Sequence, residues 1–245
     1  MRLSQTTLYG LLFVMSCLVP VRAGAAAPAL ELTTEDDPPH NMLKDGKLTG
    51  VATEKLEEAF KRIGVAQHAT LMPWARAYQS ALNTRDVCVY SAGRTPEREA
   101  LFQWVGPIAT LDWVLYTRAD GTPKPARLED IRKETIGGYL QDVISVWLAG
   151  NGYHVDTASG DDFNPQKLLN NRFNYWASSR TRAESLIEKQ GLGQRIIPVL
   201  TFGHTDLYLA CNLAVPPDTV TKLNDALRQM GQDGTSAKIE AHFSR

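Results

Sequence analysis

The chain has 245 residues, of which 43% are hydrophobic and 22% are charged, and its formal net charge at pH 7 is −1. This composition is typical of a globular protein, and the length suits one large domain or two smaller lobes. A chain so close to neutrality lacks the basic excess that nucleic acid or an anionic membrane surface would require. We therefore predict no nucleic-acid partner.

The first 25 residues have the pattern of a secretory signal peptide. Arg2 provides a positive start, Leu8 to Val21 is apolar, and Ala23-Gly24-Ala25 is a small-residue cleavage site. The apolar stretch is short for a membrane span, and no later segment is long enough for one. We predict that residues 1–25 are a signal peptide, that the protein is exported to the periplasm, and that the mature chain is not inserted in the membrane. Cys17 leaves a lipidated N-terminus open as an alternative.

Strand-like and helix-like segments alternate along the first part of the mature chain. The pattern predicts strands at 30–33, 68–72 and 87–90, an amphipathic helix from Gly50 to Gly64, and a second helix that opens at Pro73. Strands that alternate with helices indicate a parallel sheet. The predicted fold class is therefore α/β.

Two cysteines, Cys88 and Cys211, remain after the predicted cleavage. An even pair in an oxidising compartment favours a disulfide, although two separate buried thiols are the alternative. Neither the cysteines nor the five histidines show the spacing of a metal site. We predict no metal and no cofactor.

The segment from Tyr90 to Pro107 is the most informative part of the sequence. It leaves a strand, passes small residues, and reaches Thr95 and Pro96, which suit the start of a helix. Arg94 and Arg98 would then lie at the end of a strand and beside a helix N-terminus. This combination predicts a site for a carboxylate or another anion.

The arrangement resembles that of the bacterial extracellular solute-binding proteins of family 3, the periplasmic receptors of amino-acid-type transporters. Three further stretches, Pro38–Gly50, Leu128–Gly138 and Leu223–Phe243, are similar to segments of that family and occur in the same order. The resemblance implies a two-lobed periplasmic-binding-protein fold of type II. Each lobe would be a mostly parallel sheet flanked by helices, and hinge strands would lie near Trp113–Tyr116 and Asp206–Leu209.

The resemblance also implies how the chain divides. Residues 28–112 together with 206–245 would form lobe 1, and residues 113–205 would form lobe 2. In this fold the returning strand lies next to the third strand of lobe 1, which would place Cys211 beside Cys88. Neighbouring strands satisfy the Cα separation of less than about 7 Å that a disulfide needs.

In that family an arginine grips the carboxylate of the ligand, and this role falls on Arg98. A surface arginine is the alternative. Ser91 and Thr95 are candidate hydroxyl donors, with local capping as the alternative. The turn is two residues shorter than in the family, and Arg94 would fill the gap. Trp74, at a strand-to-helix junction, would stack on a ligand or pack in the core.

Further candidates lie at other strand ends. Glu35 follows the first strand, and Tyr139, Gln141 and Asp142 form a strand-to-helix turn that would face the cleft from lobe 2. This turn differs from the small glycine and threonine residues that the family has there. Trp176 would line the base of the cleft or pack beneath it.

Ser179 marks the clearest departure from the family. It takes the place of an aspartate that binds the amino group of the ligand. A buried ammonium would need another counter-charge, from Asp142, Glu35 or Asp161. The resemblance therefore leaves open a standard amino acid, an organic anion, or an amine that is held differently.

The sequence predicts a monomeric receptor that closes on a small polar, carboxylate-bearing solute and serves an inner-membrane ABC permease or a sensor kinase. One alternative is an enzyme on the same scaffold that resembles cyclohexadienyl dehydratases, with Glu35, Asp142 or His40 as the general acid or base. The other is a binding module that has lost its ligand.

Overall fold

A computed structural model describes residues 29–243 of the chain. The predicted signal peptide and Cys17 lie outside these residues. Within residues 29–243, no helix is both long enough and apolar enough to cross a membrane.

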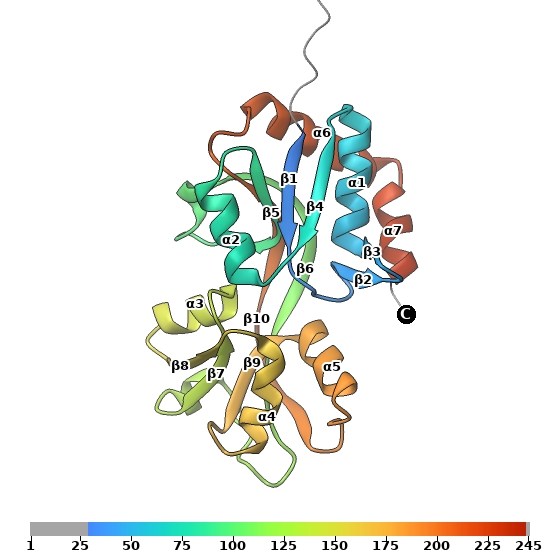
Figure 1. Ribbon diagram of the computed structural model, residues 1–245. Coiled ribbons are helices and arrows are strands. Elements are labelled where there is room, and N and C mark those ends of the chain that lie inside the picture. The colour runs from blue at the N-terminus through green and yellow to red at the C-terminus, as the bar shows by residue number, and fades with distance from the viewer. Residues whose placement is uncertain (1–28, 244–245) are drawn as a thin grey trace, which may run out of the picture.

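Two α/β lobes are joined by two long strands, β6 (Gln103–Arg118) and β10 (Ile196–Cys211), as Figure 1 shows. These strands pair antiparallel from Ile196 opposite Arg118 to Cys211 opposite Gln103. They connect the lobes within one eight-stranded sheet of order β4-β1-β5-β10-β6-β9-β7-β8. The two-lobed α/β fold is thus confirmed, and the segments predicted as hinges lie inside β6 and β10. The division at 112/113 and 205/206 falls within these strands and stays a prediction.

Lobe 1 contains three parallel strands, in the order β4-β1-β5, with helices on both faces (Figure 1). The strands predicted at 30–33, 68–72 and 87–90 and the helices predicted from Gly50 and Pro73 are confirmed. The elements of lobe 1 are β1 (Leu30–Thr34), β2 (Met42–Lys44), β3 (Lys47–Thr49), α1 (Val51–Ile63), β4 (Gln67–Leu71), α2 (Trp74–Asn83), β5 (Val87–Gly93), α6 (Pro217–Gln232) and α7 (Thr235–Phe243).

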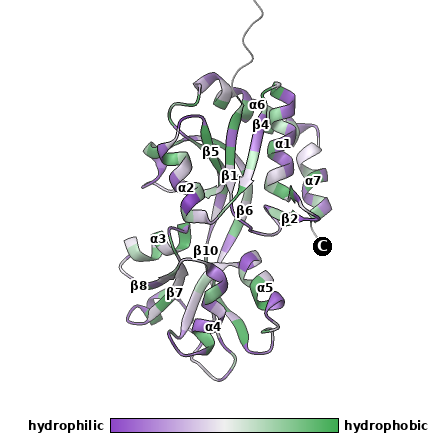
Figure 2. Ribbon diagram, viewed as in Figure 1, coloured by the Kyte–Doolittle hydropathy of each residue, from purple (hydrophilic) through white to green (hydrophobic). Residues whose placement is uncertain are grey.

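Glycines set both ends of α1. Gly50 has a φ of 127°, and a Cβ there would collide with the carbonyl of His40, so that the close approach needs glycine. Gly64 ends the helix in the left-handed conformation, with a φ of 68°. Between them, α1 carries both hydrophobic and hydrophilic positions (Figure 2), and it buries Leu56 and Phe60. The amphipathic pattern therefore fixes which face of α1 meets the sheet.

Lobe 2 is smaller, and its strand β7 pairs parallel with β8 and with β9. β9 in turn pairs antiparallel with β6, which attaches the lobe to the connecting strands. The elements of lobe 2 are the 3-10 turn η2 (Leu128–Ile131), β7 (Thr135–Tyr139), α3 (Val143–Gly150), β8 (His154–Ala158), the 3-10 turn η3 (Asp161–Phe163), α4 (Asn164–Leu169), β9 (Tyr175–Ser179) and α5 (Arg180–Lys189).

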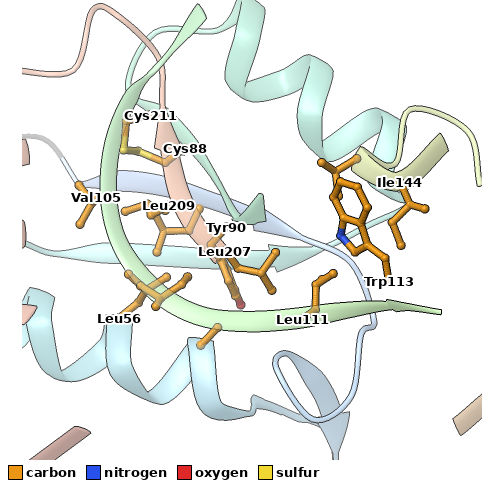
Figure 3. Close-up of a cluster of buried hydrophobic side chains, with 14 of the residues drawn as sticks. Leu56, Cys88, Tyr90, Val105, Leu111, Trp113, Ile144, Leu207, Leu209 and Cys211 are labelled. Carbon is orange, nitrogen blue, oxygen red and sulfur yellow. A yellow bond between two sulfur atoms is a disulfide. The ribbon is translucent and has the colours of Figure 1, made fainter. Parts of the chain in front are cut away.

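A disulfide between Cys88 and Cys211 ties β5 to β10 in the core of lobe 1 (Figure 3). The two residues are direct partners in the antiparallel register, and their Cα atoms are 4.0 Å apart. Val105 and Leu209, both fully buried, lie close by. The predicted disulfide is confirmed, and the alternative of two separate thiols is wrong.

The helix predicted at Thr95 and Pro96 is absent, and this prediction was wrong. The amide of Arg98 donates to the carbonyl of Thr95 in a tight turn, and a single 3-10 turn, η1 (Glu99–Leu101), follows. The chain enters β6 at Gln103, directly after this turn and Phe102. No α-helix therefore begins at Thr95 and Pro96, the residues that precede Arg98.

Candidate functional site

The carboxyl ends of parallel strands from both lobes meet where the lobes face each other. In lobe 1, β1 ends toward lobe 2 (Figure 1), and Glu35 is the next residue. In lobe 2, β7 ends at Tyr139, and β9 ends at Ser179. Because ligands of open α/β sheets bind beyond the carboxyl ends of strands, this interface is the candidate site.

Arg98 is buried at the interface, with 4% of its surface exposed. Its Nη1 donates to the carbonyl of Gly93 at 3.2 Å, and its Nη2 donates to the carbonyl of Gln141 at 2.7 Å. The guanidinium lies over the ring of Tyr78, 5.0 Å from its centroid. Burial lowers the pKa of Arg98, and the guanidinium keeps its proton and its positive charge. The guanidinium thus joins lobe 1 to lobe 2, and the alternative of a surface arginine is wrong.

The Gln141 carbonyl is the acceptor on the lobe 2 side of this contact. Gln141 has a φ of 61°, a strained value for a residue other than glycine. In this conformation its carbonyl accepts from Arg98 and also from Nε1 of Trp74 at 3.0 Å. The amide of Trp74 reaches the hydroxyl of Tyr139 at 3.2 Å. Trp74 is therefore buried in the contact between the lobes, and its stacking on a ligand stays a prediction.

Arg182, in the first turn of α5, is the central residue that the sequence analysis missed. Its Nη2 lies 2.6 Å from Oε1 of Glu35, and its Nε lies 3.1 Å from Oδ1 of Asp37. Its Nη1 is 3.9 Å from Oδ1 of Asp142. The guanidinium also lies over the ring of Tyr139, 5.2 Å from the centroid. One arginine of lobe 2 therefore meets two carboxylates of lobe 1 and one of its own lobe.

The carboxylates around Arg182 differ in how they hold protons. Burial raises the pKa of Glu35 to about 8, against the attraction of Arg182. Burial acts in the same sense on Asp37, but Arg182 and His40 hold the pKa of that carboxyl well below its usual range. Burial also raises the pKa of Asp142. Asp37 thus keeps the charge that pairs with Arg182, and Glu35 takes up a proton more readily than an ordinary glutamate does.

Asp161 is a fourth carboxylate near Arg182, and it is held by lobe 2. Its oxygens accept from Nε1 of Trp176 at 2.9 Å, from the hydroxyl of Ser178 at 2.6 Å and from the amide nitrogen of Asn164 at 2.7 Å. Burial raises the pKa of Asp161, although Arg182 opposes the shift. Trp176 is fully buried and packs beneath the interface, where it orients Asp161.

The space between the lobes consists of an outer and an inner pocket, which share Glu35 and Arg182 as lining residues. The outer pocket has a volume of about 560 Å³, and the inner pocket has only about 10 Å³, room for roughly one water molecule. The outer pocket is also lined by Asp36, Leu71, Met72, Pro73, Tyr139, Gly160, Asp161, Asp162, Leu186 and Lys189, and the inner one by Asp37, Trp74, Ser91, Gly93, Arg98, Leu111, Asp142, Val143 and Leu207. A third pocket, of about 560 Å³, lies on lobe 1 between α1 and α7 and shares no lining residue with these two.

Three predicted site residues are engaged in local contacts. Ser91, with a φ of 61°, lines the inner pocket and donates its hydroxyl to the side chain of Asn41. The hydroxyl of Ser179 caps α5 by accepting from the amide of Arg182 at 3.3 Å. Thr95 holds the turn before Arg98 through its carbonyl. Binding of a ligand by these residues stays a prediction.

Arg94 points to a different part of lobe 1. Its guanidinium makes two hydrogen bonds to the carboxylate of Glu99, at 2.6 and 2.7 Å. It also lies over the rings of Trp104 and Tyr208, 5.6 and 5.4 Å from the two centroids. Arg94 lines neither interface pocket, so the structure places it apart from Arg98.

A local signal for Arg182 was present in the sequence. The residue lies three positions after Ser179, in the first turn of the helix that follows a strand end facing the cleft. Asp37 likewise follows directly on Glu35 and Asp36. In residues 29–243, no group of three or more histidine, cysteine, aspartate or glutamate residues is arranged to hold a metal ion. The site therefore offers two guanidinium groups and several carboxylates, which suit a small charged molecule.

Comparison with known proteins agrees with the two-lobed fold. The family described as bacterial extracellular solute-binding proteins, family 3, matches residues 30–245. No curated protein matches the sequence.

Among solved structures, a histidine kinase sensor domain with similarity to periplasmic binding proteins has a TM-score of 0.81 at 16% identity, over 89% of this chain and 97% of that one. An ancestral arginine-binding protein bound to arginine has a TM-score of 0.75 at 20% identity, over 90% and 100% of the two chains. The substrate-binding protein of an amino acid ABC transporter has a TM-score of 0.73 at 15% identity, over 89% and 99%. At these identities the shared property is the fold.

Proposed function

Since this chain belongs to the bacterial extracellular solute-binding proteins of family 3, we propose that it is a periplasmic receptor that binds a small polar solute between its lobes. The observation that carries the proposal is the burial of Arg98 at the interface, where its guanidinium reaches a carbonyl of each lobe. Backbone carbonyls are neutral partners for a buried cation, so that an anionic group would be a stronger one. Arg98 is thus the anchor for a solute carboxylate.

The solute that fits best carries a cationic group as well as a carboxylate. Ser179 brings no charge, but Glu35, Asp142 and Asp161 gather around Arg182, as a replacement for the missing aspartate would require. These carboxylates are buried, and buried carboxylates favour a cationic partner. A cationic or zwitterionic amino acid would meet Arg98 with one end and the carboxylates with the other. The ancestral relative that was solved with arginine supports this class of solute.

The receptor would serve a transporter or a sensor by presenting a different surface when its lobes close. The two kinds of structural neighbour, a histidine kinase sensor domain and a transporter binding protein, support one use each. Both uses need the same solute-binding step.

Thermal unfolding with libraries of amino acids, polyamines and organic acids tests the proposal. A solute at 100 times its dissociation constant should stabilise the protein by about 2.7 kcal/mol. The Arg98→Ala variant should lose this stabilisation and still give the far-UV circular dichroism of a folded protein. Arg94→Ala is the matched control, because Arg94 pairs with Glu99 outside the two interface pockets, and it should keep the full shift.

Three results would contradict the proposal. Stabilisation that survives Arg98→Ala would show that the anchor is elsewhere. Conversion of the solute to a product would support the dehydratase-like alternative. If no solute in the three libraries raises the unfolding temperature, the result would support a module that has lost its ligand.

A further inference from the structure

Arg182 links the two lobes through charged groups. It belongs to α5 of lobe 2, whereas Glu35 and Asp37 follow β1 of lobe 1. Its Nη2 and Nε lie 2.6 and 3.1 Å from these two carboxylates. All three side chains are largely buried, with 11%, 12% and 3% of the surface exposed for Arg182, Glu35 and Asp37. Ion pairs that are shielded from water in this way are screened little by salt.

The balance of charge shows that Arg182 is needed where it lies. Glu35, Asp37, Asp142 and Asp161 all interact electrostatically with its guanidinium. Buried carboxylates that lose their cation are strongly destabilising. The carboxylates would therefore attract any other cation that could replace Arg182.

Arg182 also stands between the two pockets of the interface, because it lines both. Arg98 lines only the inner one, whose volume of about 10 Å³ leaves no room for a carboxylate. A solute that enters from the outer pocket, of about 560 Å³, meets Arg182 before it reaches Arg98. On this route, the side chain of Arg182 lies between the solute and Arg98.

We propose that Arg182 is a built-in latch, whose guanidinium takes the place of a solute's cationic group between the lobes. The ion pair with Asp37 and the hydrogen bond to Glu35 hold the lobes together without a solute, and a solute binds by displacing Arg182 from these two residues. The displacement step rests on the proposed solute-binding function, whereas latching by itself does not. The latched form cannot bind a solute at Arg98. The apparent association constant is therefore the intrinsic one multiplied by the fraction of molecules that are not latched.

Small-angle X-ray scattering on the purified protein with no added solute tests the latch directly. The Arg182→Met variant keeps much of the side-chain volume and loses the charge, so that its radius of gyration should exceed that of the wild type. Arg172→Met is the matched control in lobe 2, because Arg172 pairs with Asp156 of its own lobe and not with Glu35 or Asp37. Its radius of gyration should equal that of the wild type.

Chemical rescue sharpens the test. The Arg182→Ala variant leaves a space of guanidinium size among the carboxylates, which methylguanidinium should fill. We expect methylguanidinium to return the radius of gyration of this variant to the wild-type value, and sodium chloride at the same ionic strength to leave it unchanged. If the Arg182 variants fail to fold by circular dichroism, the double variant Glu35→Gln with Asp37→Asn removes the lobe 1 half of the latch and should also expand.

An Arg182→Met variant as compact as the wild type would overturn the latch, and so would a wild type that is already expanded without solute. These outcomes are distinguishable from failure of the proposed function. A protein without a latch would still show solute-dependent stabilisation that requires Arg98. A latched protein without a solute would still show the difference in scattering.

Discussion

The core of lobe 1 and the interface between the lobes are held together by different forces. In the core, Cys88, Cys211, Tyr90 and Leu209 have no exposed surface, and they belong to a cluster of buried hydrophobic side chains (Figure 3). At the interface, guanidinium groups meet carboxylates and backbone carbonyls. Apolar burial has no direction and depends on close packing, whereas an ion pair depends on protonation and can be exchanged for another. The core of lobe 1 is therefore suited to staying packed, and the interface is suited to contacts that break and form again.

The largest effect should come from removing volume in the core. Phe60 on α1 is 1% exposed and belongs to the apolar cluster of lobe 1. Replacing it with alanine should lower the free energy of unfolding by roughly 3–5 kcal/mol, as measured by urea denaturation. Leu43→Ala is the control, because Leu43 is 61% exposed and should change stability by no more than about 0.5 kcal/mol. Equal effects of the two variants would show that the core does not pack as described.

Loss of the disulfide should have the next largest effect. The bond joins residues 123 positions apart, and its removal frees the unfolded chain. The double variant Cys88→Ala with Cys211→Ala should be less stable by about 2–4 kcal/mol in urea denaturation. Wild-type protein in reductant should show a similar loss. Alkylation of the unreduced native protein at two thiols, seen by intact mass, would contradict the bond.

The interface should instead respond to pH. The pKa of Glu35 rises from 4.5 to about 8 on folding, so that between these values the folded protein holds a proton that the unfolded chain has released. Its stability must therefore fall as the pH rises through this range. One unit of pKa difference corresponds to about 1.4 kcal/mol, and we expect a loss of at least that size. Asp37 acts in the opposite sense, because its lowered pKa contributes stability that is lost below its ordinary value of 3.8.

Glu35→Gln isolates this contribution, since glutamine mimics the protonated carboxyl. The variant should lose less stability than the wild type between about pH 5 and pH 8, when unfolding is followed in urea at each pH. A smaller slope should remain, because the pKa values of Asp142 and Asp161 are also raised. Parallel pH profiles of variant and wild type would rule out Glu35 as the source. Phe60→Ala should parallel the wild type, and this would show that the core does not share the response.

The parts of the structure that follow from local pattern were predictable. The amphipathic pattern and the glycines predicted α1, and the order of similar segments predicted two lobes joined by two strands. That fold placed Cys211 beside Cys88, as the register of β5 and β10 confirms. The prediction of a helix at Thr95 was wrong, because residues that suit a helix start also suit a turn. Here a turn and the 3-10 turn η1 lead into β6.

The sequence by itself determined the α/β class from its periodicity, and the resemblance to the family supplied the two lobes and the pairing of Cys88 with Cys211. The choice of Arg98 also came from that resemblance, and its binding of a solute stays a prediction. Only the tertiary structure decided that Arg182 occupies the interface, because its partner Glu35 lies 147 positions away. An arginine at the start of a helix is typical of a solvated surface, and an acidic residue in a loop is too. In the folded chain, Arg182 and Glu35 are buried together and join the two lobes. Burial depends on the tertiary structure, and therefore the sequence did not reveal this contact.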